Sequence, residues 1–388
     1  MPDADREANL RRAIEERKAA NALRALTLSG SLVDFCSNDY LGFARSARLR
    51  DMAEERARRR DDFLGSTGSR LISGNSELCE SLERRIAGFH GAEAGLIFNS
   101  GYDANLGLIS SVPQRSDTVL YDELAHASIR DGLRLTFARS YSFRHSDLDD
   151  LKRKIGLARG QVFVVVESIY SMDGDAAPLT EMALLCRERG CHLIVDEAHA
   201  TGVYGPGGRG RVVELGLEQE VFARVHTFGK ALGAHGAIVL GSETLRTFLI
   251  NFARSFIYTT FLPPHSLLAV ESAYDLLGES QEVIETLRHN IRLFRAGIPA
   301  GLGGSFTESH SSIQCLLISG NDRVKQASGY LTRQGFDVRP ILSPTVPQGR
   351  ERLRFCLHAF NRPADVQRLT ELLGGCFQDT QRAAVAES

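Results

Sequence analysis

The hydrophobic pattern of this chain is most regular over its central part. From about residue 46, short apolar runs such as 161–166 and 237–240 alternate with stretches long enough for a helix. Runs that are apolar throughout and separated by helices are typical of parallel strands buried on both faces. We therefore expect an α/β fold with a large domain over residues 46–275, in which helices cover a mostly parallel sheet.

The two ends of the chain have different patterns. Residues 5–26 read as a charged helix. Beyond the large domain, a long helix at 282–295 and a strand at 313–318 indicate a smaller α+β domain. The expected division is an N-terminal helical segment at 1–45, the large domain, and a C-terminal α+β domain at 276–388.

Composition and charge are those of an ordinary globular protein. The chain has 388 residues, of which 43% are hydrophobic, so it is long enough for one large core and a smaller domain. A formal charge of -2 and a pI near 6.6 argue against a broad nucleic-acid footprint. The first residues are too charged for a secretory signal, and no apolar run reaches about eighteen residues. We expect a cytoplasmic protein that binds neither nucleic acid nor membrane.

The cysteines form no C-x-x-C pair and no regular framework, which suits a reducing compartment. They are Cys36, Cys79, Cys186, Cys191, Cys315, Cys356 and Cys376. His192 and His199 lack the H-E-x-x-H spacing of a common zinc site. The sequence therefore gives no support for a metal site.

The most informative segment is 226–233, which places Lys230 directly after Gly229 and shortly after a predicted strand. A lysine amine that forms an imine with an aldehyde cofactor must approach it closely, and glycine neighbours keep other side chains out of the way. The alternative is an ordinary surface charge, because long ammonium side chains are rarely buried unpaired. Other residues must decide between these two interpretations.

Asp196 ends the apolar run 192–195, at the carboxyl end of a predicted strand, and His199 follows three residues later. In open parallel sheets, ligands collect beyond those ends. An aspartate there can hold the ring nitrogen of pyridoxal phosphate through a charge-assisted hydrogen bond, and the protonated ring then withdraws electrons from a bound amino acid. The alternative for Asp196 is a helix N-cap.

Further positions suit the same cofactor. His126 follows the run 118–121, where its imidazole is placed to lie over a flat ring, and a strand, turn and helix start at 96–105 would present backbone donors to a phosphate. Thr227, three residues before Lys230, offers a hydroxyl to the same phosphate. A histidine or threonine at a strand end is otherwise usually structural.

The order of these residues resembles that of the α-oxoamine synthases, fold-type I pyridoxal-phosphate enzymes that join an amino acid to an acyl thioester with loss of carbon dioxide. The resemblance covers nearly the whole chain. It rests on the segments 37–42, 65–70, 73–75, 171–175, 196–199, 226–233, 257–260, 344–347 and 352–354. Within the family, 227–237 and 258–264 look most like the branch that uses L-alanine and a pimeloyl thioester in biotin biosynthesis. The runner-up is the branch that joins glycine to an acetyl thioester.

The resemblance implies a catalytic or cofactor-binding role for each matching residue. Lys230 would hold pyridoxal phosphate as an imine and then act as acid and base, Asp196 would pair with the ring nitrogen, and His126 would stack on the ring. The other cofactor contacts would come from Ser100, Gly101, Tyr102, Glu167, Ser171, His199 and Thr227.

The resemblance also implies a homodimer and a substrate site. Thr259 or Thr260 would complete the phosphate site of a second subunit. Arg24, Asn38 and His126 would contact substrate, and Arg354 would bind the carboxylate of the amino acid. The acyl donor would be a coenzyme A or carrier-protein thioester.

The chain departs from the family pattern at two places. Cys79 stands where a histidine is frequent, and Cys356 and His358 stand where small hydroxyl residues are frequent. The second place lies near the expected substrate, so these residues bear on the identity of the acyl chain.

Two rival motifs carry less weight. Residues 196–199 spell a helicase box, but the sequence has no G-x-x-x-x-G-K-[ST] loop. Gly205, Gly207 and Gly210 fit G-x-G-x-x-G, yet the match does not directly follow a strand that opens into a helix. A scaffold that keeps the fold without cofactor is the non-enzymatic alternative, and it would make Lys230 and Asp196 dispensable.

Overall fold

The computed structural model describes residues 7–28, 30–60 and 64–386. These residues form two compact units. The larger unit comprises Asn38–Ser171 and Asp175–Thr286, and the smaller unit combines the chain up to Ser37 with Met172–Gly174 and the chain from Leu287 onward. The three-part division expected from the sequence stays a prediction. By contacts, the N-terminal segment up to Ser37 belongs with the C-terminal part of the chain.

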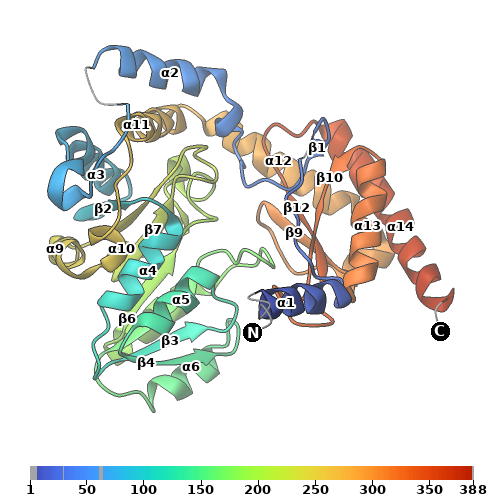
Figure 1. Cartoon of the computed structure of the whole chain (residues 1–388), viewed down its shortest axis with the longest axis horizontal. Helices are drawn as coiled ribbons and strands as arrows, with labels where there is room; N and C mark the ends of the chain where they lie inside the picture. Colours follow the sequence, from blue (N-terminus) through green and yellow to red (C-terminus); the bar gives the residue numbers. More distant parts are fainter. Residues whose placement is uncertain (1–6, 29, 61–63, 387–388) are drawn as a thin grey trace, which may run out of the picture. The chain divides into compact units, whose positions relative to one another are not determined.

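A seven-stranded sheet forms the centre of the larger unit, in the order β2-β8-β7-β6-β5-β3-β4 (Figure 1). Strands β3 to β7 run parallel, whereas β8 is antiparallel to its neighbours β2 and β7. The strands are β2 (Ala94–Phe98), β3 (Thr118–Asp122), β4 (Arg139–Phe143), β5 (Val162–Glu167), β6 (His192–Asp196), β7 (Ala223–Thr227) and β8 (Ala237–Gly241). The expectation of a mostly parallel sheet is confirmed.

Alternate residues of these strands are buried on opposite faces of the sheet. Phe163 and Val165 of β5 pack into one core with side chains of α4, α5, α9 and α10, whereas Val164 and Val166 pack into a second core with α6, α7 and α8. The helices are α2 (Ala47–Arg58), α3 (Glu77–Phe89), α4 (Gly101–Ser111), α5 (Ala127–Leu135), α6 (Leu148–Ile155), α7 (Leu179–Arg189), α8 (Arg211–Glu214), α9 (Glu243–Phe252), α10 (Arg254–Ile257) and α11 (Pro264–Gly278). Burial on both faces explains why the strands read as continuous apolar runs.

The smaller unit contains two small sheets and the helices around them. One sheet is antiparallel in the order β11-β12-β9, and the other pairs β1 with β10 in parallel. Its elements are α1 (Ala8–Ala19), β1 (Val33–Asp34), β9 (Ile313–Leu317), α13 (Asn321–Arg333), β10 (Phe336–Asp337), β11 (Arg339–Ile341), β12 (Arg352–Cys356) and α14 (Pro363–Ala386), and α12 (Gln281–Gly297) crosses the boundary between the units. The expected helix at 282–295 and strand at 313–318 are present as α12 and β9.

The N-terminal helix is shorter than the 5–26 expected from the sequence. Helix α1 covers Ala8–Ala19, and residues 5 and 6 lie outside the described residues. The chain leaves the helical conformation at Asn21, whose φ is 46°. Every side chain of α1 is exposed, so the helix has no buried apolar face to extend it further.

Within residues 7–28, 30–60 and 64–386, no helix has the length and apolar character to cross a membrane. The same part of the chain holds no group of three or more His, Cys, Asp or Glu side chains arranged to bind a metal ion.

Candidate active site

The expected site residues of the larger unit gather at the carboxyl ends of the parallel strands. Glu167 ends β5, Asp196 ends β6 and Thr227 ends β7. Glu167 and Asp196 are direct register partners, so their carboxyl groups leave neighbouring strands at the same edge. Ligands of open α/β sheets collect at this edge.

The Asp196 carboxylate is buried and hydrogen-bonded on both oxygens. Oδ2 accepts from Asn105 Nδ2 at 2.7 Å, and Oδ1 accepts from the backbone N–H of Ala198 at 2.9 Å. Asn105 Nδ2 also lies 3.0 Å from Ser128 Oγ, which lies 2.8 Å from Nδ1 of His126. A chain of polar contacts thus runs from Asp196 to His126. A turn rather than a helix follows Asp196, so the N-cap interpretation is wrong.

Lys230 is half-buried and hydrogen-bonded, which separates it from an ordinary surface charge. Its Nζ lies 2.6 Å from Nε2 of His199. The other ring nitrogen of His199 lies 2.7 Å from the hydroxyl of Tyr40, which donates to Oδ1 of Asn38 at 3.1 Å. These contacts bring together Lys230, His199 and Asn38, all expected from the sequence.

Glu167 is the most unusual of the expected residues. It is 3% exposed, and its Oε1 has no hydrogen-bond partner in the described part of the chain. Burial first, and the neighbouring Asp196 carboxylate second, raise the pKa of Glu167 to about 8, although Lys230 acts in the opposite direction. Glu167 is therefore mostly neutral at pH 7.

The expected phosphate seat is the start of α4. Ser100 caps this helix by accepting from the Asp103 N–H at 3.0 Å, and Gly101 and Tyr102 open its first turn, whose N–H groups have no partner within the helix. A Cβ on Gly101 would lie 3.6 Å from Thr227 Oγ1, so the hydroxyl at the end of β7 lies beside this turn. Backbone donors and a hydroxyl together suit an anion.

Thr259 and Thr260 lie near the same turn. Asn99 Nδ2, just before Ser100, donates to Thr259 Oγ1 at 3.2 Å and to the Thr260 carbonyl at 2.7 Å. Their expected contact with a second subunit stays a prediction. Ser171 follows β5 in a hairpin that the bridge between Ile169 and Ala176 closes.

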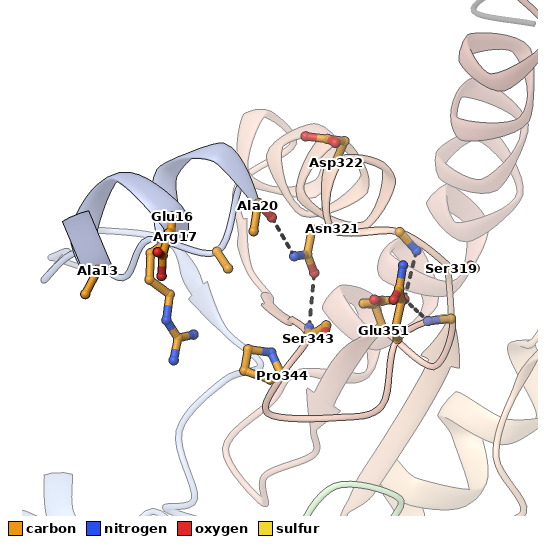
Figure 2. A pocket seen from close by; sticks show the side chains of 14 residues that line it. Ala13, Glu16, Arg17, Ala20, Ser319, Asn321, Asp322, Ser343, Pro344 and Glu351 are labelled. Atoms are coloured by element: carbon orange, nitrogen blue, oxygen red, sulfur yellow. Dashed lines mark hydrogen bonds between the residues drawn. The ribbon is translucent and has the colours of Figure 1, made fainter.

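Arg24 and Arg354 belong to the smaller unit. Arg24 Nη2 donates to Thr345 Oγ1 at 3.0 Å. The two residues before Thr345, Ser343 and Pro344, line a hollow of about 770 Å³ between α1 and the start of α13. Figure 2 shows this hollow, where Asn321 joins Ala20 to Ser343. Arg354 is half-buried on β12, opposite Cys315 of β9.

The three residues at which the chain departs from the family pattern are buried. Cys79, Cys356 and His358 are each 0% exposed, and burial raises the pKa of the Cys79 thiol. His358 lies 2.9 Å from the Ser37 carbonyl through Nε2, and its backbone N–H donates to Asn361 Oδ1 at 2.8 Å. These contacts explain the histidine as a structural residue of the smaller unit.

The glycine-rich segment at 205–210 does not offer a phosphate site. The helix that follows it, α8, has only four residues. Its first N–H groups, from Arg211 and Val212, donate to the buried carboxylate of Glu197 at 2.7 and 3.3 Å. Those donors are therefore taken by a side chain of the protein itself.

The sequence did not identify Asn105, Ser128 or Tyr40 as site residues. Their contacts join positions far apart along the chain, and no local pattern marks them. One available signal was a polar asparagine inside the otherwise apolar helix stretch that follows residue 103.

The groups of the larger unit suit pyridoxal phosphate. Lys230 supplies an amine, Asp196 a buried carboxylate for a ring nitrogen, and the turn at Gly101 supplies donors for a phosphate. The imidazole of His126 is exposed, which leaves its face accessible to a flat ring. Oε1 of Glu167 is a buried polar atom that a neighbouring ligand would face.

Comparison with known proteins agrees with this cofactor. A family model described as aminotransferase class I and II matches residues 31–373. An 8-amino-7-oxononanoate synthase of Emericella nidulans is 42% identical over 402 residues, which cover 96% of each chain. Among solved structures, serine palmitoyltransferase of Sphingomonas wittichii has a TM-score of 0.88 at 27% identity and covers 99% of this chain and 100% of its own. The 8-amino-7-oxononanoate synthase of Francisella tularensis has a TM-score of 0.76 at 26% identity and covers 92% of this chain and 99% of its own.

Proposed function

Because the chain belongs to the aminotransferase class I and II family of pyridoxal-phosphate enzymes, we propose that it is an acyltransferase that makes 8-amino-7-oxononanoate for biotin biosynthesis. The substrates are L-alanine and a pimeloyl thioester, and the products are 8-amino-7-oxononanoate, carbon dioxide and the free thiol. The likeness to the Emericella nidulans synthase over 96% of both chains carries this proposal. The geometry around Asp196 and Lys230 supports the cofactor.

The protein's own residues bind, orient and move protons. Bound pyridoxal phosphate supplies an electron sink for the bonds that break at the α-carbon of alanine. Asp196 would accept a hydrogen bond from the protonated ring nitrogen, and Asn105 holds the carboxylate in place for it. His126 would stack on the ring, and the N–H groups of Gly101 and Tyr102 with the Thr227 hydroxyl would bind the phosphate.

Lys230 would hold the cofactor through its amine, and the same amine, when free, would act as the base that takes the α proton of alanine. His199 lies 2.6 Å from this amine, so it is placed to share the proton. His199 and Ser171 would contact the phenolic oxygen of the cofactor. Tyr40 fixes the orientation of the His199 ring from the other side. Glu167 lies beside Asp196 on the neighbouring strand β5 and is buried with it.

Four residues are assigned to the substrates. Arg354 binds the carboxylate of alanine through its guanidinium, and Arg24 and Asn38 contact the substrates. His126 would contact the amino acid as well as the ring. Each of these assignments rests on the family likeness.

We propose a homodimer, in which Thr259 or Thr260 reaches the phosphate of the second subunit. Large apolar side chains of the larger unit are exposed around these threonines and along 64–72, and they supply an apolar surface for a second copy. These side chains are Leu64, Leu71, Ile72 and Tyr258. The cysteines that the structure describes are all free thiols, which supports a cytoplasmic location.

A second candidate function is another reaction of the α-oxoamine synthase type. The serine palmitoyltransferase of Sphingomonas wittichii superposes with a higher TM-score, 0.88, than the 8-amino-7-oxononanoate synthase of Francisella tularensis, 0.76. Glycine C-acetyltransferase is the runner-up from the sequence. These reactions differ from the proposed one in the amino acid and the acyl chain, and one methylene changes binding by only about 1–3 kcal/mol.

The test is thiol release by the purified protein with every pair of pimeloyl, acetyl, succinyl or palmitoyl coenzyme A and alanine, glycine or serine. Fastest release with pimeloyl donor and alanine supports the proposal, and a preference for acetyl donor and glycine replaces it with the runner-up. A pimeloyl carrier-protein thioester is tested in parallel, because the acyl donor is either a coenzyme A or a carrier-protein thioester. A colourless protein that binds no added pyridoxal phosphate would favour the non-enzymatic interpretation, in which the chain keeps the fold without the cofactor.

A further inference from the structure

Asp122, His145 and Asp175 form a charged cluster that has no role in the site described above. Nδ1 of His145 lies 2.9 Å from Oδ1 of Asp122, and Nε2 lies 2.7 Å from Oδ2 of Asp175. The Asp122 side chain is fully buried, and those of His145 and Asp175 are each 24% exposed. An imidazole that faces a carboxylate at both nitrogens must donate from both, and only the protonated ring does so.

The surroundings of His145 favour the protonated, positively charged imidazole. Burial alone would lower the pKa of His145, but the hydrogen bonds to Asp122 and Asp175 raise it to about 10. Glu123 adds a third carboxylate, whose Oε1 accepts from the backbone N–H of His145 at 3.1 Å. The rings of Tyr170 and His145 form a T-shaped pair, with centroids 4.5 Å apart. The nearby Arg144 is paired with Asp147, which leaves the carboxylates of the cluster to the histidine.

Asp122 shapes the loop that leads to His126. Its Oδ1 accepts from the N–H of Leu124 at 2.8 Å, and its carbonyl accepts from the N–H of Ala125 at 2.9 Å. Its Oδ2 accepts from the N–H of Ser146, next to His145, at 2.9 Å. His126 follows Ala125 directly, so the Asp122 side chain fixes the backbone path to the residue proposed to stack on the cofactor.

Asp175 closes the hairpin that carries Ser171. Its carbonyl accepts from the N–H of Tyr170 at 3.0 Å, and the bridge between Ile169 and Ala176 lies just outside this contact. Ser171 follows Tyr170 in the turn. The position of the Asp175 side chain is therefore tied to the position of the Ser171 hydroxyl.

We propose that His145 is a positioning residue that joins the loop carrying His126 to the hairpin carrying Ser171 and so orients both side chains toward the cofactor. The loop and the hairpin each contribute a carboxylate, and without the cation between them these like charges repel. The inference rests on the proposed function, because His126 and Ser171 have their cofactor roles only there.

Replacement of His145 by asparagine removes the cation and one of the two hydrogen bonds. In the cofactor-free protein, His145→Asn is expected to speed hydrogen–deuterium exchange about tenfold or more in both 122–128 and 168–176. In the loaded protein, it is expected to weaken pyridoxal phosphate binding about tenfold and to shift the pH midpoint of the absorption of the bound cofactor. His289→Asn, an exposed histidine on α12, is the matched control and leaves all of these quantities unchanged.

A second variant distinguishes the charge of His145 from its bulk. His145→Asn combined with Asp175→Asn removes the unneutralised carboxylate, so it is expected to recover part of the cofactor affinity lost in His145→Asn. Faster exchange confined to 144–147, or a further loss of affinity in the double variant, would overturn the proposal. These readouts use no acyl thioester, so a chain that fails to condense alanine can still pass or fail this test.

Discussion

Nδ2 of Asn105 lies 2.7 Å from Oδ2 of Asp196 and 3.0 Å from Oγ of Ser128, so one amide of α4 joins the carboxylate at the end of β6 to the start of α5. Asn105 is 2% exposed, which shelters these contacts from water. A buried carboxylate held in this way keeps its orientation when a cofactor binds. The cofactor site therefore depends on a residue of a helix as well as on the strand ends.

Replacement of Asn105 by leucine is expected to weaken pyridoxal phosphate binding and to lower kcat, each by about tenfold. A hydrogen bond to a charged group contributes about 1.5–3 kcal/mol, and about 1.4 kcal/mol corresponds to a factor of ten. A cofactor titration followed by absorbance and a steady-state assay measure the two effects. Asn251→Leu, on the exposed face of α9, is the control. Wild-type affinity in Asn105→Leu would contradict the role assigned to this amide.

Replacement of Tyr40 by phenylalanine is expected to lower kcat about tenfold with a smaller change in the KM for alanine. The change removes the hydroxyl that lies 2.7 Å from Nδ1 of His199, and the loss of this hydrogen bond costs up to about 1.5 kcal/mol. Because His199 contacts Lys230, the pH dependence of kcat should shift as well. Tyr141→Phe, an exposed tyrosine of β4, is the control, and equal kinetics in the two variants would argue against the Tyr40 contact.

Replacement of Glu167 by glutamine is expected to change how stability depends on pH. The pKa of Glu167 is raised by burial and by Asp196 to about 8 from an ordinary value of 4.5, so the folded state favours the neutral acid. The wild type therefore loses stability as pH rises from about 4.5 to 8, by at most about 1.4 kcal/mol for each pKa unit. Glutamine is always neutral.

The measurement is the melting temperature of the cofactor-free wild type and of Glu167→Gln between pH 5 and 9. We expect the melting temperature of Glu167→Gln to rise relative to that of the wild type as pH increases. A constant difference across this range would show that Glu167 is ionised in the folded protein.

Replacement of Glu83 by glutamine is expected to destabilise the larger unit by about 3–5 kcal/mol, because it leaves a buried arginine without its counter-ion. Glu83 is 1% exposed, pairs with Arg70 and accepts from the Ile97 N–H at 2.7 Å. Denaturant unfolding measures the change. Glu80→Gln on the same helix, where the Glu80 side chain is 43% exposed, should cost less than about 1 kcal/mol. Similar losses in both variants would contradict the expected cost of the buried pair.

The strands and the residues at their ends were predictable because their signals are local. The apolar run at 162–166 is buried on both faces, and Asp196 and Thr227 stand where such runs stop. The direction of β8 was not predictable, because an apolar run of this length fits either direction. The residues that orient the site, Asn105 and Tyr40, act through contacts between distant parts of the chain, which a local pattern does not record.

At two other places, the sequence pattern predicts more regular structure, or a larger domain, than the structure has. A charged, periodic segment predicts a longer helix, but α1 stops at Ala19 and buries none of its side chains. Met172–Gly174 likewise reads as part of the large domain, yet its contacts place it in the smaller unit. Asp173 pairs there with Arg352 at 2.5 Å. Tertiary contacts, or their absence, therefore decide both outcomes, and a local pattern records neither.

The most direct measurement is the stoichiometry of condensation with L-alanine labelled with ¹³C at its carboxyl group and pimeloyl coenzyme A. The account predicts one labelled carbon dioxide and one 8-amino-7-oxononanoate for each thiol released, and no product from the Lys230→Ala variant. Thiol release without labelled carbon dioxide, or turnover that survives in Lys230→Ala, would contradict the account.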